Sequence, residues 1–522
     1  MATDSPLPQR CDVAIVGGGH NALVAATYLA RAGWSVVVLE RSDHVGGAAV
    51  SERPFPGVDA RLSRYSYLVS VMPDALIADL DLGLELRSRP TASFTPTLEG
   101  THAGGLYVEH VEGAATAESF RALTGSDREY DAWRSFYADV ADFARAISPS
   151  FLEPLPSASD VRGKVSARMW TELVEAPLGT VVESRFADDL VRGVVATDAL
   201  IGTFASLGDP SLAQNRCFLY HLVGNGTGEW RVPVGGMGAV TAELARVARQ
   251  AGAQLATGRE VTAIELSDTG AAVTVAGDQT VECDWVLGGA APAVLSRLRG
   301  HEPENDPRGA QLKLNLLVER LPRLRSGVDP AAAFAGTFHV NESYSELQSA
   351  YGQAASGRMP DQPPGELYCH TLTDDSILSP ELAKAGAHTL TYFGIHMPPE
   401  VFEPDVPSAR QRATHAALAA IDTHLEEPIE SLLVRDSDGN PCLEAKAPQD
   451  VEEALAMPGG HIFHGDLGWP WRDEPADRPA ERWGVATDHP RLLLCGSGAQ
   501  RGGAVSGIGG HNAAMALLEG TA

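Results

Sequence analysis

A glycine turn that is followed by an acid is the part of this sequence with the clearest chemical meaning. Gly17 and Gly19 follow the apolar run Val13–Val16, and Glu40 ends a second apolar run. Gly17 permits a tight turn, and Gly19 lets a phosphate approach backbone N–H groups at the start of a helix. Glu40 lies where an acid accepts hydrogen bonds from ribose hydroxyls. The pattern predicts a strand–turn–helix–strand unit that binds a dinucleotide.

The residues after the turn should belong to the same cradle. His20 and Asn21 open the predicted helix, whose N-terminal N–H groups and positive dipole end favour phosphate. Ala22 is small enough for the helix to pack closely on the first strand. The alternative is a structural turn without a ligand, but the complete strand–turn–helix–strand context favours binding.

A second glycine pair follows the acid. Arg41 comes directly after Glu40, and Gly46, Gly47 and Ala48 lie further along the same loop. A plain NAD-binding domain does not require this pair. A larger cofactor that runs across the edge of the sheet needs more backbone that it can approach closely. The second pair therefore favours a larger dinucleotide.

Several segments between residues 12 and 515 resemble a known family. The sequence resembles the phytoene desaturase and amine oxidase superfamily of FAD-dependent oxidoreductases, and most of all its phytoene-dehydrogenase-related branch, which includes the pyridine nucleotide-disulphide oxidoreductase domain-containing proteins. The segments are GGGHNALVAATYLARAG, VLERSDHVGGAAVSE, ARLSRYSYLVS, GEWRVPVGGMGAVTAELARVARQAGA, GREVTAI, GGHIFHGDLGWPW and LLLCGSGAQRGGAVSGIGGHNAA. The resemblance implies FAD as the cofactor. It also implies an α/β fold, in which a Rossmann-like FAD-binding domain is interrupted by a mixed α+β substrate domain.

The resemblance assigns cofactor contacts outside the first turn. It implies that the backbone at Val261 meets the adenine. It also implies that the segment from Gly496 to Gly507 and Ile508 follows the ribitol and pyrophosphate.

The sequence Gly-Gly-His-Asn-Ala occurs at residues 18–22 and again at 509–513. The second copy should direct a helix N-terminus at the pyrimidine edge of the flavin, where it would stabilise negative charge. We interpret His20 and His511 as helix-start residues rather than as catalysts.

Two positions depart from the family pattern. Ala48 stands where many flavoproteins of this superfamily have an Arg near the cofactor phosphates. Arg41, Arg53 or backbone donors alone could then serve the phosphates. Arg501 stands where the family commonly has a Pro, and it could meet the cofactor or substrate, or face the solvent.

The candidate catalytic side chain is Lys313, in the predicted strand Leu312–Glu319. Amine oxidases that the sequence resembles have a Lys on the equivalent strand, where it holds a water near flavin N5. The alternative is a surface Lys on an amphipathic strand, with Asn315 on the same face. Because flavin itself supplies the hydride chemistry, such a reaction needs no strong side-chain base.

Histidines and aromatic residues give further candidates. The run Gly460–Trp471 contains His461, His464 and Asp466, and we interpret it as an aromatic loop near the flavin; no metal is expected. Three aromatic residues are candidates for pocket lining or core packing: Tyr65, Tyr67 and Trp230. Three histidines of the predicted substrate domain are expected to be core or pocket polar groups: His339, His370 and His396.

Composition limits the class of protein. The chain has 522 residues and a net charge of −28, from 68 acids and 40 bases. This excess disfavours nucleic acid as a partner, since phosphate contacts require clustered Lys and Arg. No apolar run approaches the roughly 20 residues of a membrane span, and the N-terminus lacks an apolar signal region. Six scattered cysteines without a C-x-x-C pair fit a reducing cytoplasm.

The periodicity predicts a discontinuous cofactor domain with two inserts. Residues 8–75, 230–300 and 455–522 should form the FAD-binding domain. Residues 76–229, which are helix-rich, and 301–454 should form the substrate domain. Strands are predicted at 36–39, 271–275, 284–288 and 337–340.

The predicted function is an FAD-dependent oxidoreductase that takes hydride from a mainly apolar organic substrate. Desaturation or dehydrogenation of an isoprenoid-, lipid- or polyketide-like molecule is the first hypothesis, with O₂ or a quinone as possible electron acceptor. Amine oxidation is the alternative, and an aromatic cage with a functioning Lys313 would favour it. A redox-neutral isomerase and a regulatory flavoprotein of low activity are further alternatives. The oligomeric state and any peripheral membrane contact stay open.

Overall fold

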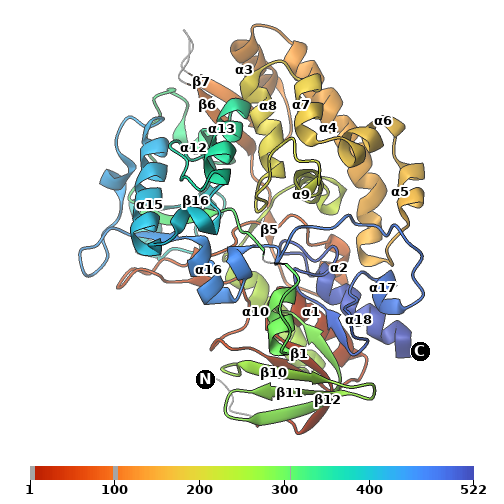
Figure 1. Ribbon diagram of the computed structural model, residues 1–522. Coiled ribbons are helices and arrows are strands. Elements are labelled where there is room, and N and C mark those ends of the chain that lie inside the picture. Colours follow the sequence, from red (N-terminus) through yellow and green to blue (C-terminus); the bar gives the residue numbers. More distant parts are fainter. Residues whose placement is uncertain (1–5, 98–103, 306, 522) are drawn as a thin grey trace.

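Two seven-stranded sheets form the framework of the chain. The computed structural model describes residues 6–97, 104–305 and 307–521. Figure 1 shows the sheet that contains β1 (Arg10–Val16) at the bottom of the view and the sheet that contains β16 (His388–Gly394) above it. A group of helices stands beside the upper sheet. This mixed α/β architecture is the one that the sequence predicted.

The first sheet is mainly parallel and is built around β1. β1 pairs in parallel with β2 and β12, and β12 pairs in parallel with β18 and antiparallel with β11. Residues 13–16 of β1 and all of β2 are buried, as expected for strands covered on both faces. The other strands are β2 (Val36–Leu39), β9 (Gln254–Ala256), β10 (Val261–Leu266), β11 (Ala271–Val275), β12 (Gln279–Gly288) and β18 (Leu492–Leu494).

Among the helices that pack on this sheet, two touch through their backbones. α1 (His20–Arg31) packs against both α10 (Met237–Ala251) and α18 (Ile508–Thr521). A Cβ on Gly510 of α18 would overlap the carbonyl oxygen of Asn21 and lie 2.8 Å from its carbonyl carbon. The contact therefore requires glycine, and it brings the C-terminal helix against the first helix of the chain.

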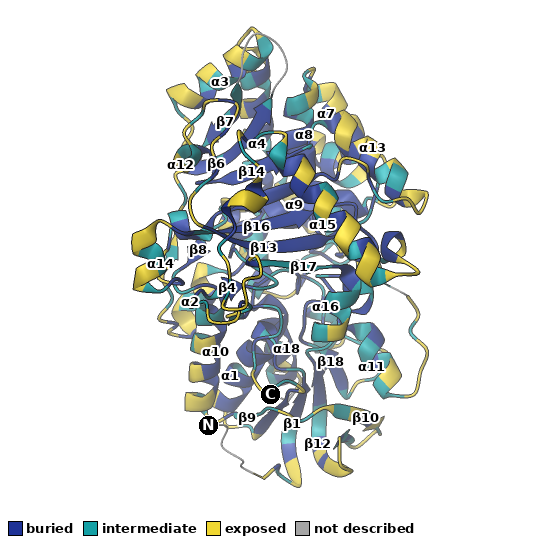
Figure 2. Cartoon of the chain, turned by 90° about the vertical axis from the view of Figure 1, so that its left-hand side faces the viewer, coloured by how far each residue is buried: buried dark blue, intermediate teal, exposed yellow. Residues whose placement is uncertain are grey.

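The second sheet is mainly antiparallel, in the order β17-β13-β16-β15-β14-β6-β7. Every residue of β13 is buried, and Figure 2 shows the central strands in dark blue between helices with exposed outer faces. The segment 76–229, predicted to be helix-rich, also supplies two strands of this sheet. The strands are β6 (Thr91–Thr97), β7 (Gly104–Glu109), β13 (Leu312–Val318), β14 (Thr337–Val340), β15 (Gly365–Tyr368), β16 (His388–Gly394) and β17 (Leu443–Lys446).

A helical region built around α4 (Arg128–Ile147) stands beside the second sheet. The buried side chains of α4 recur with helical spacing and join a large apolar cluster: Trp133, Phe136, Val140, Phe143 and Ile147. The neighbouring helices are α3 (Ala114–Thr124), α5 (Ala158–Lys164), α6 (Ala167–Trp170), α7 (Leu178–Arg185), α8 (Asp189–Ala196) and α9 (Ala213–Leu222).

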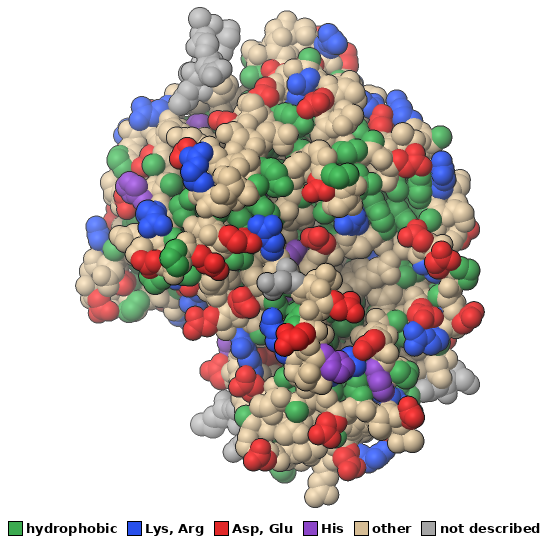
Figure 3. Space-filling view, viewed as in Figure 1, with side chains coloured by type: hydrophobic (Ala, Val, Ile, Leu, Met, Phe, Trp, Pro, Cys, Tyr) green, Lys and Arg blue, Asp and Glu red, His purple; other side chains and the backbone are tan. Residues whose placement is uncertain are grey.

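The remaining elements are short or lie on the outside of the sheets. The helices are α2 (Asp74–Asp79), α11 (Pro292–Leu298), α12 (Pro330–Ala333), α13 (Tyr344–Ala355), α14 (Pro380–Ala385), α15 (Val406–Asp422), α16 (Pro448–Leu455) and α17 (Pro479–Arg482). The strands are β3 (Ser51–Glu52), β4 (Leu62–Ser63), β5 (Leu86–Arg87) and β8 (Val232–Pro233). Within the described residues, no helix combines the length and apolarity needed to cross a membrane. On the face in Figure 3, acidic and basic side chains are interspersed.

Most predicted strand boundaries agree with the structure. β2, β11 and β14 have the predicted bounds. The strand predicted at 284–288 begins earlier, at Gln279, because its first half pairs antiparallel with β11. The two strands form a tight hairpin, with Val275 opposite Gln279. Exposed polar residues alternate with buried ones in the first half of β12, so this half does not stand out as an apolar run.

Gly510→Ala should destabilise the protein, because the new methyl group would press against the backbone of α1. We expect a loss of at least about 3 kcal/mol in the free energy of unfolding, at the upper end of overpacking effects. The matched control is Gly352→Ala in the exposed part of α13, where a Cβ meets nothing within 4 Å. It should stabilise the protein by about 0.5–1 kcal/mol. Urea unfolding of both variants measures the contrast, and equal effects would contradict the proposed contact.

Candidate active site

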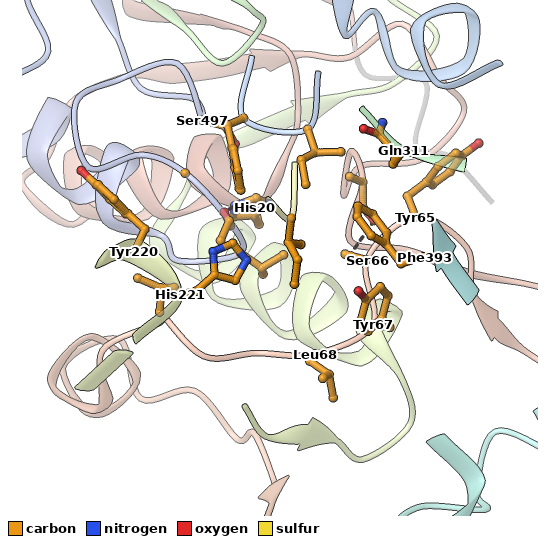
Figure 4. A pocket seen from close by; sticks show the side chains of 18 of the residues that line it. His20, Tyr65, Ser66, Tyr67, Leu68, Tyr220, His221, Gln311, Phe393 and Ser497 are labelled. Carbon is orange, nitrogen blue, oxygen red and sulfur yellow. Dashed lines mark hydrogen bonds between the residues drawn. The ribbon is translucent and has the colours of Figure 1, made fainter. Parts of the chain in front are cut away.

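A single continuous cavity of about 650 Å³ extends from the carboxyl ends of β1 and β2 to the inner face of the second sheet. Figure 4 shows its central part, with Tyr65, Tyr67 and Phe393 on one side and His20, Tyr220 and His221 on the other. The parallel strands open at their carboxyl ends, which is where ligands bind in sheets of this type.

The glycine turns form a cradle made of backbone. Gly17 has φ of +91°, and a Cβ there would lie 3.3 Å from the backbone nitrogen of Ala290. Gly19 precedes α1, and none of the described side chains caps that helix. A Cβ on Gly47 would lie 3.2 Å from the Cα of Gly19, so the two glycine loops pack directly on each other. The first N–H groups of α1 are thereby available to an anion.

The Glu40 side chain connects the loop that follows β1 to the loop that follows β2. One carboxylate oxygen accepts a hydrogen bond from Gly18 N at 2.7 Å, and the other accepts one from Ser42 N at 2.8 Å. The side chain is 9% exposed and lines the cavity. The carboxylate is therefore held at the position where a ribose would meet it.

Most of the predicted cofactor residues line the cavity, and three do not. Those that line it are Gly17, Gly19, His20, Asn21, Ala22, Glu40, Arg41, Gly47, Ala48, Val261 and Gly496. Gly46 lies behind the surface, where its N–H donates to the Gly18 carbonyl at 2.9 Å. Gly507 has φ of +75° and faces Leu76, and Ile508 begins α18 within the apolar core. These last three residues can shape the cradle but do not form its wall.

The nearby arginines are engaged with the protein. Arg41 donates to the carbonyls of Glu453 and Ala454, at 2.8 and 2.7 Å, at the end of α16. Arg53 forms an exposed ion pair with Asp59. With Ala48 in place of Arg, backbone N–H groups are the donors that the cradle itself presents.

Arg501 neither lines the cavity, where it could meet the cofactor or the substrate, nor faces the solvent. It is 1% exposed and donates to the backbone carbonyls of Ser150, Glu153 and Trp483. Burial lowers the pKa of Arg501 to about 10. Its role is to join the last glycine loop to the helical region.

The two Gly-Gly-His-Asn-Ala copies both lie at helix starts, as predicted. His20 Nε2 lies 3.1 Å from the carbonyl oxygen of Ala504, and burial lowers the pKa of His20 to about 4. His511 Nδ1 lies 2.9 Å from Asn512 Oδ1, and burial also lowers the pKa of His511. Both rings are thus uncharged at neutral pH.

Lys313 is buried in the wall of the cavity and is only 3% exposed, so the alternative of a surface Lys is wrong. Its Nζ donates to the carbonyl of Ser63 at 3.0 Å and lies 5.0 Å from the ring centre of Tyr67. Burial lowers the pKa of Lys313 well below its ordinary value. Asn315 points the same way and donates to Glu444 and to the Arg64 carbonyl, both at 3.2 Å.

Aromatic side chains line the wall next to Lys313. The ring of Tyr67 lies 4.3 Å from that of Tyr368 and 6.3 Å from that of Phe393. Opposite them, His221 stacks on Trp230 with ring centres 5.2 Å apart. Of the aromatic candidates, Tyr65, Tyr67 and Trp230 all line the cavity. The space between these walls suits a flat, mainly apolar molecule.

The inner end of the cavity is polar, which the sequence analysis only partly foresaw. His339 was a candidate polar group, but Asp198, Arg89 and Glu366 were not singled out. Burial raises the pKa of Asp198 to about 7 and that of Glu366 to about 8. Glu366 is an acid within the short strand Gly365–Tyr368, all of whose residues are buried. An acid inside such a strand is the signal that could have pointed to this part of the site.

The histidine run Gly460–Trp471 forms the expected aromatic loop. Trp469 and Trp471 stack with ring centres 4.9 Å apart. His461 Nε2 lies 3.5 Å from Asp466 Oδ1, whereas His464 is buried, and burial lowers its pKa to about 3. Within the described chain, these residues do not form a group of three metal-ligating side chains. His370 contacts Asp374 at 3.1 Å, and His396 is buried.

Comparison with known proteins places the chain in a family. Residues 15–74 match the NAD(P)-binding Rossmann-like domain, and residues 76–377 match the flavin containing amine oxidoreductase family. The chain belongs to the flavin containing amine oxidoreductase family, within the superfamily that its motifs resembled.

Individual relatives extend over the whole chain. An uncharacterized protein of Mycobacterium tuberculosis is 49% identical, with 97% of each chain covered. Pyridine nucleotide-disulfide oxidoreductase domain-containing protein 2 of Mus musculus is 29% identical, covering 98% of this chain and 94% of its own. A crystal structure of putrescine oxidase is similar in fold, with 17% sequence identity, a TM-score of 0.58 and 98% of each chain covered.

The cradle fits an FAD molecule. Two glycine loops in backbone contact, an uncapped helix N-terminus and a fixed carboxylate would hold the pyrophosphate and ribose. The cavity then continues past Lys313 between the aromatic walls.

Asp198→Asn should stabilise the protein more at pH 8 than at pH 5. Since its pKa is raised from 3.8 to about 7, folded Asp198 keeps a proton that the unfolded chain has already lost. Its contribution to stability is therefore present below pH 3.8 and declines as the pH rises to about 7. Asn cannot titrate, so the difference between variant and wild type grows over this range. Denaturant unfolding at both pH values measures it, and the exposed Asp473→Asn should show no such change.

Proposed function

We propose that this protein binds FAD in the cavity and acts as a dehydrogenase or desaturase on a mainly apolar organic substrate. The observation that carries the proposal is the continuity of the cavity from the glycine cradle to the aromatic walls around Lys313. When bound, the flavin supplies the hydride acceptor. The electron acceptor that completes the cycle is proposed to be O₂ or a quinone.

The protein's own residues would bind and position. Glu40 and the backbone of Gly17 and Gly19 would hold the cofactor. Tyr67 and Tyr368 would orient a flat substrate and exclude water from it. Lys313, whose pKa is lowered by burial and whose position is fixed by the Ser63 carbonyl, would hold a water or handle a proton beside the reacting carbon.

Amine oxidation is the second candidate, and a specific observation favours it. Lys313 is enclosed with Tyr67, Tyr368 and Phe393, which is the aromatic surrounding that an amine oxidase would need. Cyclic and aliphatic amines should be tested beside apolar alcohols and polyenes. The class that bleaches the visible flavin band under anaerobic conditions identifies the reaction.

The visible spectrum of the purified protein is the first test. We expect a flavin spectrum and release of FAD on denaturation. Glu40→Ala should bind FAD about 10- to 100-fold more weakly, because charged hydrogen bonds within the cradle and to the ribose are lost. The control is Glu282→Ala, an exposed acid on β12 of the same sheet. A colourless protein that takes up no added FAD would overturn the proposed function.

Lys313→Met should keep FAD but reduce it slowly. With the substrate that bleaches the wild type, we expect the anaerobic reduction rate to fall about 100-fold or more, because a positioned proton-handling group is lost. The FAD content and the apparent KM should change little. If Lys313 only supports the Ser63 carbonyl, stability or FAD content would fall while the reduction rate of bound flavin stayed the same.

A further inference from the structure

Three buried side chains meet at the inner end of the cavity, away from the glycine cradle. β14 and β15 pair antiparallel and place His339 directly opposite Glu366. Glu342 follows the end of β14 and turns towards the same point. His339 is 4% exposed, Glu342 is 1% exposed and Glu366 is 2% exposed. Two acids and one imidazole are therefore removed from water together.

These groups approach one another without forming hydrogen bonds. His339 Nε2 lies 3.9 Å from Glu342 Oε2 and 3.8 Å from Glu366 Oε1. Among the described residues, neither carboxylate oxygen of Glu342 forms a hydrogen bond of good geometry, although the Thr197 hydroxyl lies close enough to lower the pKa of Glu342. A buried polar group without a partner costs about 1–3 kcal/mol, and more when it is charged. The cluster therefore lacks a group that would satisfy it.

The surrounding residues fix two of the three atoms that face one another. The Thr95 hydroxyl lies 2.7 Å from His339 Nδ1, which holds the ring so that Nε2 faces the acids. The Tyr368 hydroxyl donates to Glu366 Oε2, which leaves Oε1 facing His339. Hydrogen bonds of this kind orient metal ligands in known sites.

We propose that His339, Glu342 and Glu366 bind a divalent transition-metal ion, with Zn²⁺ as the representative. One ligand atom from each residue lies within 4.8 Å of the other two. Ligands about 2.1 Å from a tetrahedral ion are about 3.4 Å apart. His339 Nε2 lies 3.9 and 3.8 Å from the two carboxylates, and the carboxylate oxygens lie within 4.8 Å of each other, so side-chain shifts of about 0.5 to 1.4 Å would close the site. The two carboxylates would balance the charge of the ion. Mg²⁺ and Ca²⁺ favour about six oxygen ligands, which these residues do not supply.

The position of the cluster supports binding. His339 and Glu366 line the cavity, whereas Glu342 lies behind them. A fourth ligand position would therefore face the cavity, where a water or a substrate oxygen can bind. Three protein ligands with one open position is the arrangement of catalytic zinc sites.

The test measures metal content on the full chain, with and without added FAD. After treatment with a chelator and incubation with Zn²⁺, the wild type should retain about one ion per chain through gel filtration. Mg²⁺ should not be retained. Glu342→Gln keeps the shape of the side chain and should weaken Zn²⁺ binding at least 10-fold, since even second-shell changes have effects of 10- to 100-fold. His339→Asn should act in the same way and provides an independent variant.

The matched control is Glu112→Gln, which removes the charge of another acid of the cavity wall that lies outside the cluster and accepts a hydrogen bond from Trp133. It should bind Zn²⁺ like the wild type. The competing explanation is that Glu342 and Glu366 are simply protonated, since burial raises the pKa of both. A wild type that retains no Zn²⁺, or a Glu342→Gln variant that retains as much as the wild type, would overturn the proposal. Because metal content does not depend on flavin, this outcome is separate from that of the proposed function.

Discussion

The close packing of backbone on backbone around α1 is the constraint on which the structure depends. Gly510 brings α18 against the carbonyl group of Asn21, and Gly47 brings the second glycine loop against Gly19. Any side chain at these contacts would push the segments apart. The contacts bring residues from the first fifty and the last fifteen positions of the chain into one cradle. The carboxyl ends of β1 and β2 then open onto a surface in which glycine backbone is exposed, which is what a pyrophosphate requires.

The second determinant is the removal of polar groups from water between the two sheets. Lys313, Asp198, Glu366 and His339 all line one cavity, and burial shifts the pKa of each of them towards the neutral form. Such groups cost stability unless they act on a ligand or a metal ion, so their concentration in one cavity marks it as functional. Their distribution is also informative. Lys313 lies among aromatic rings near the proposed flavin position, and Glu366 lies behind the same aromatic wall, where it accepts a hydrogen bond from the Tyr368 hydroxyl.

The family accounts for the framework, while particular residues shape the cradle and the cavity of this protein. Membership of the flavin containing amine oxidoreductase family accounts for the Rossmann-like sheet and the second sheet above it. The cradle has Ala48 where relatives of this superfamily commonly have an Arg, and Arg41 binds carbonyls at the end of α16 instead. The buried group His339, Glu342 and Glu366 is a further property of this chain, and it enters no part of the proposed flavin chemistry.

The sequence alone determined the parts of the protein that depend on neighbours in the chain. The strand–turn–helix–strand unit, Glu40 and the bounds of β2 follow from local turn chemistry and apolar periodicity, which act over a few residues. Tertiary structure alone decided which side chains share a cavity. Lys313 could have faced solvent on an amphipathic strand, and only the cover supplied by Ser63 and Tyr67 made it a buried wall residue. Arg501 was misjudged for the same reason, because its carbonyl partners near Ser150 are distant in sequence. Burial and charge depend on contacts between remote segments, and periodicity carries no information about them.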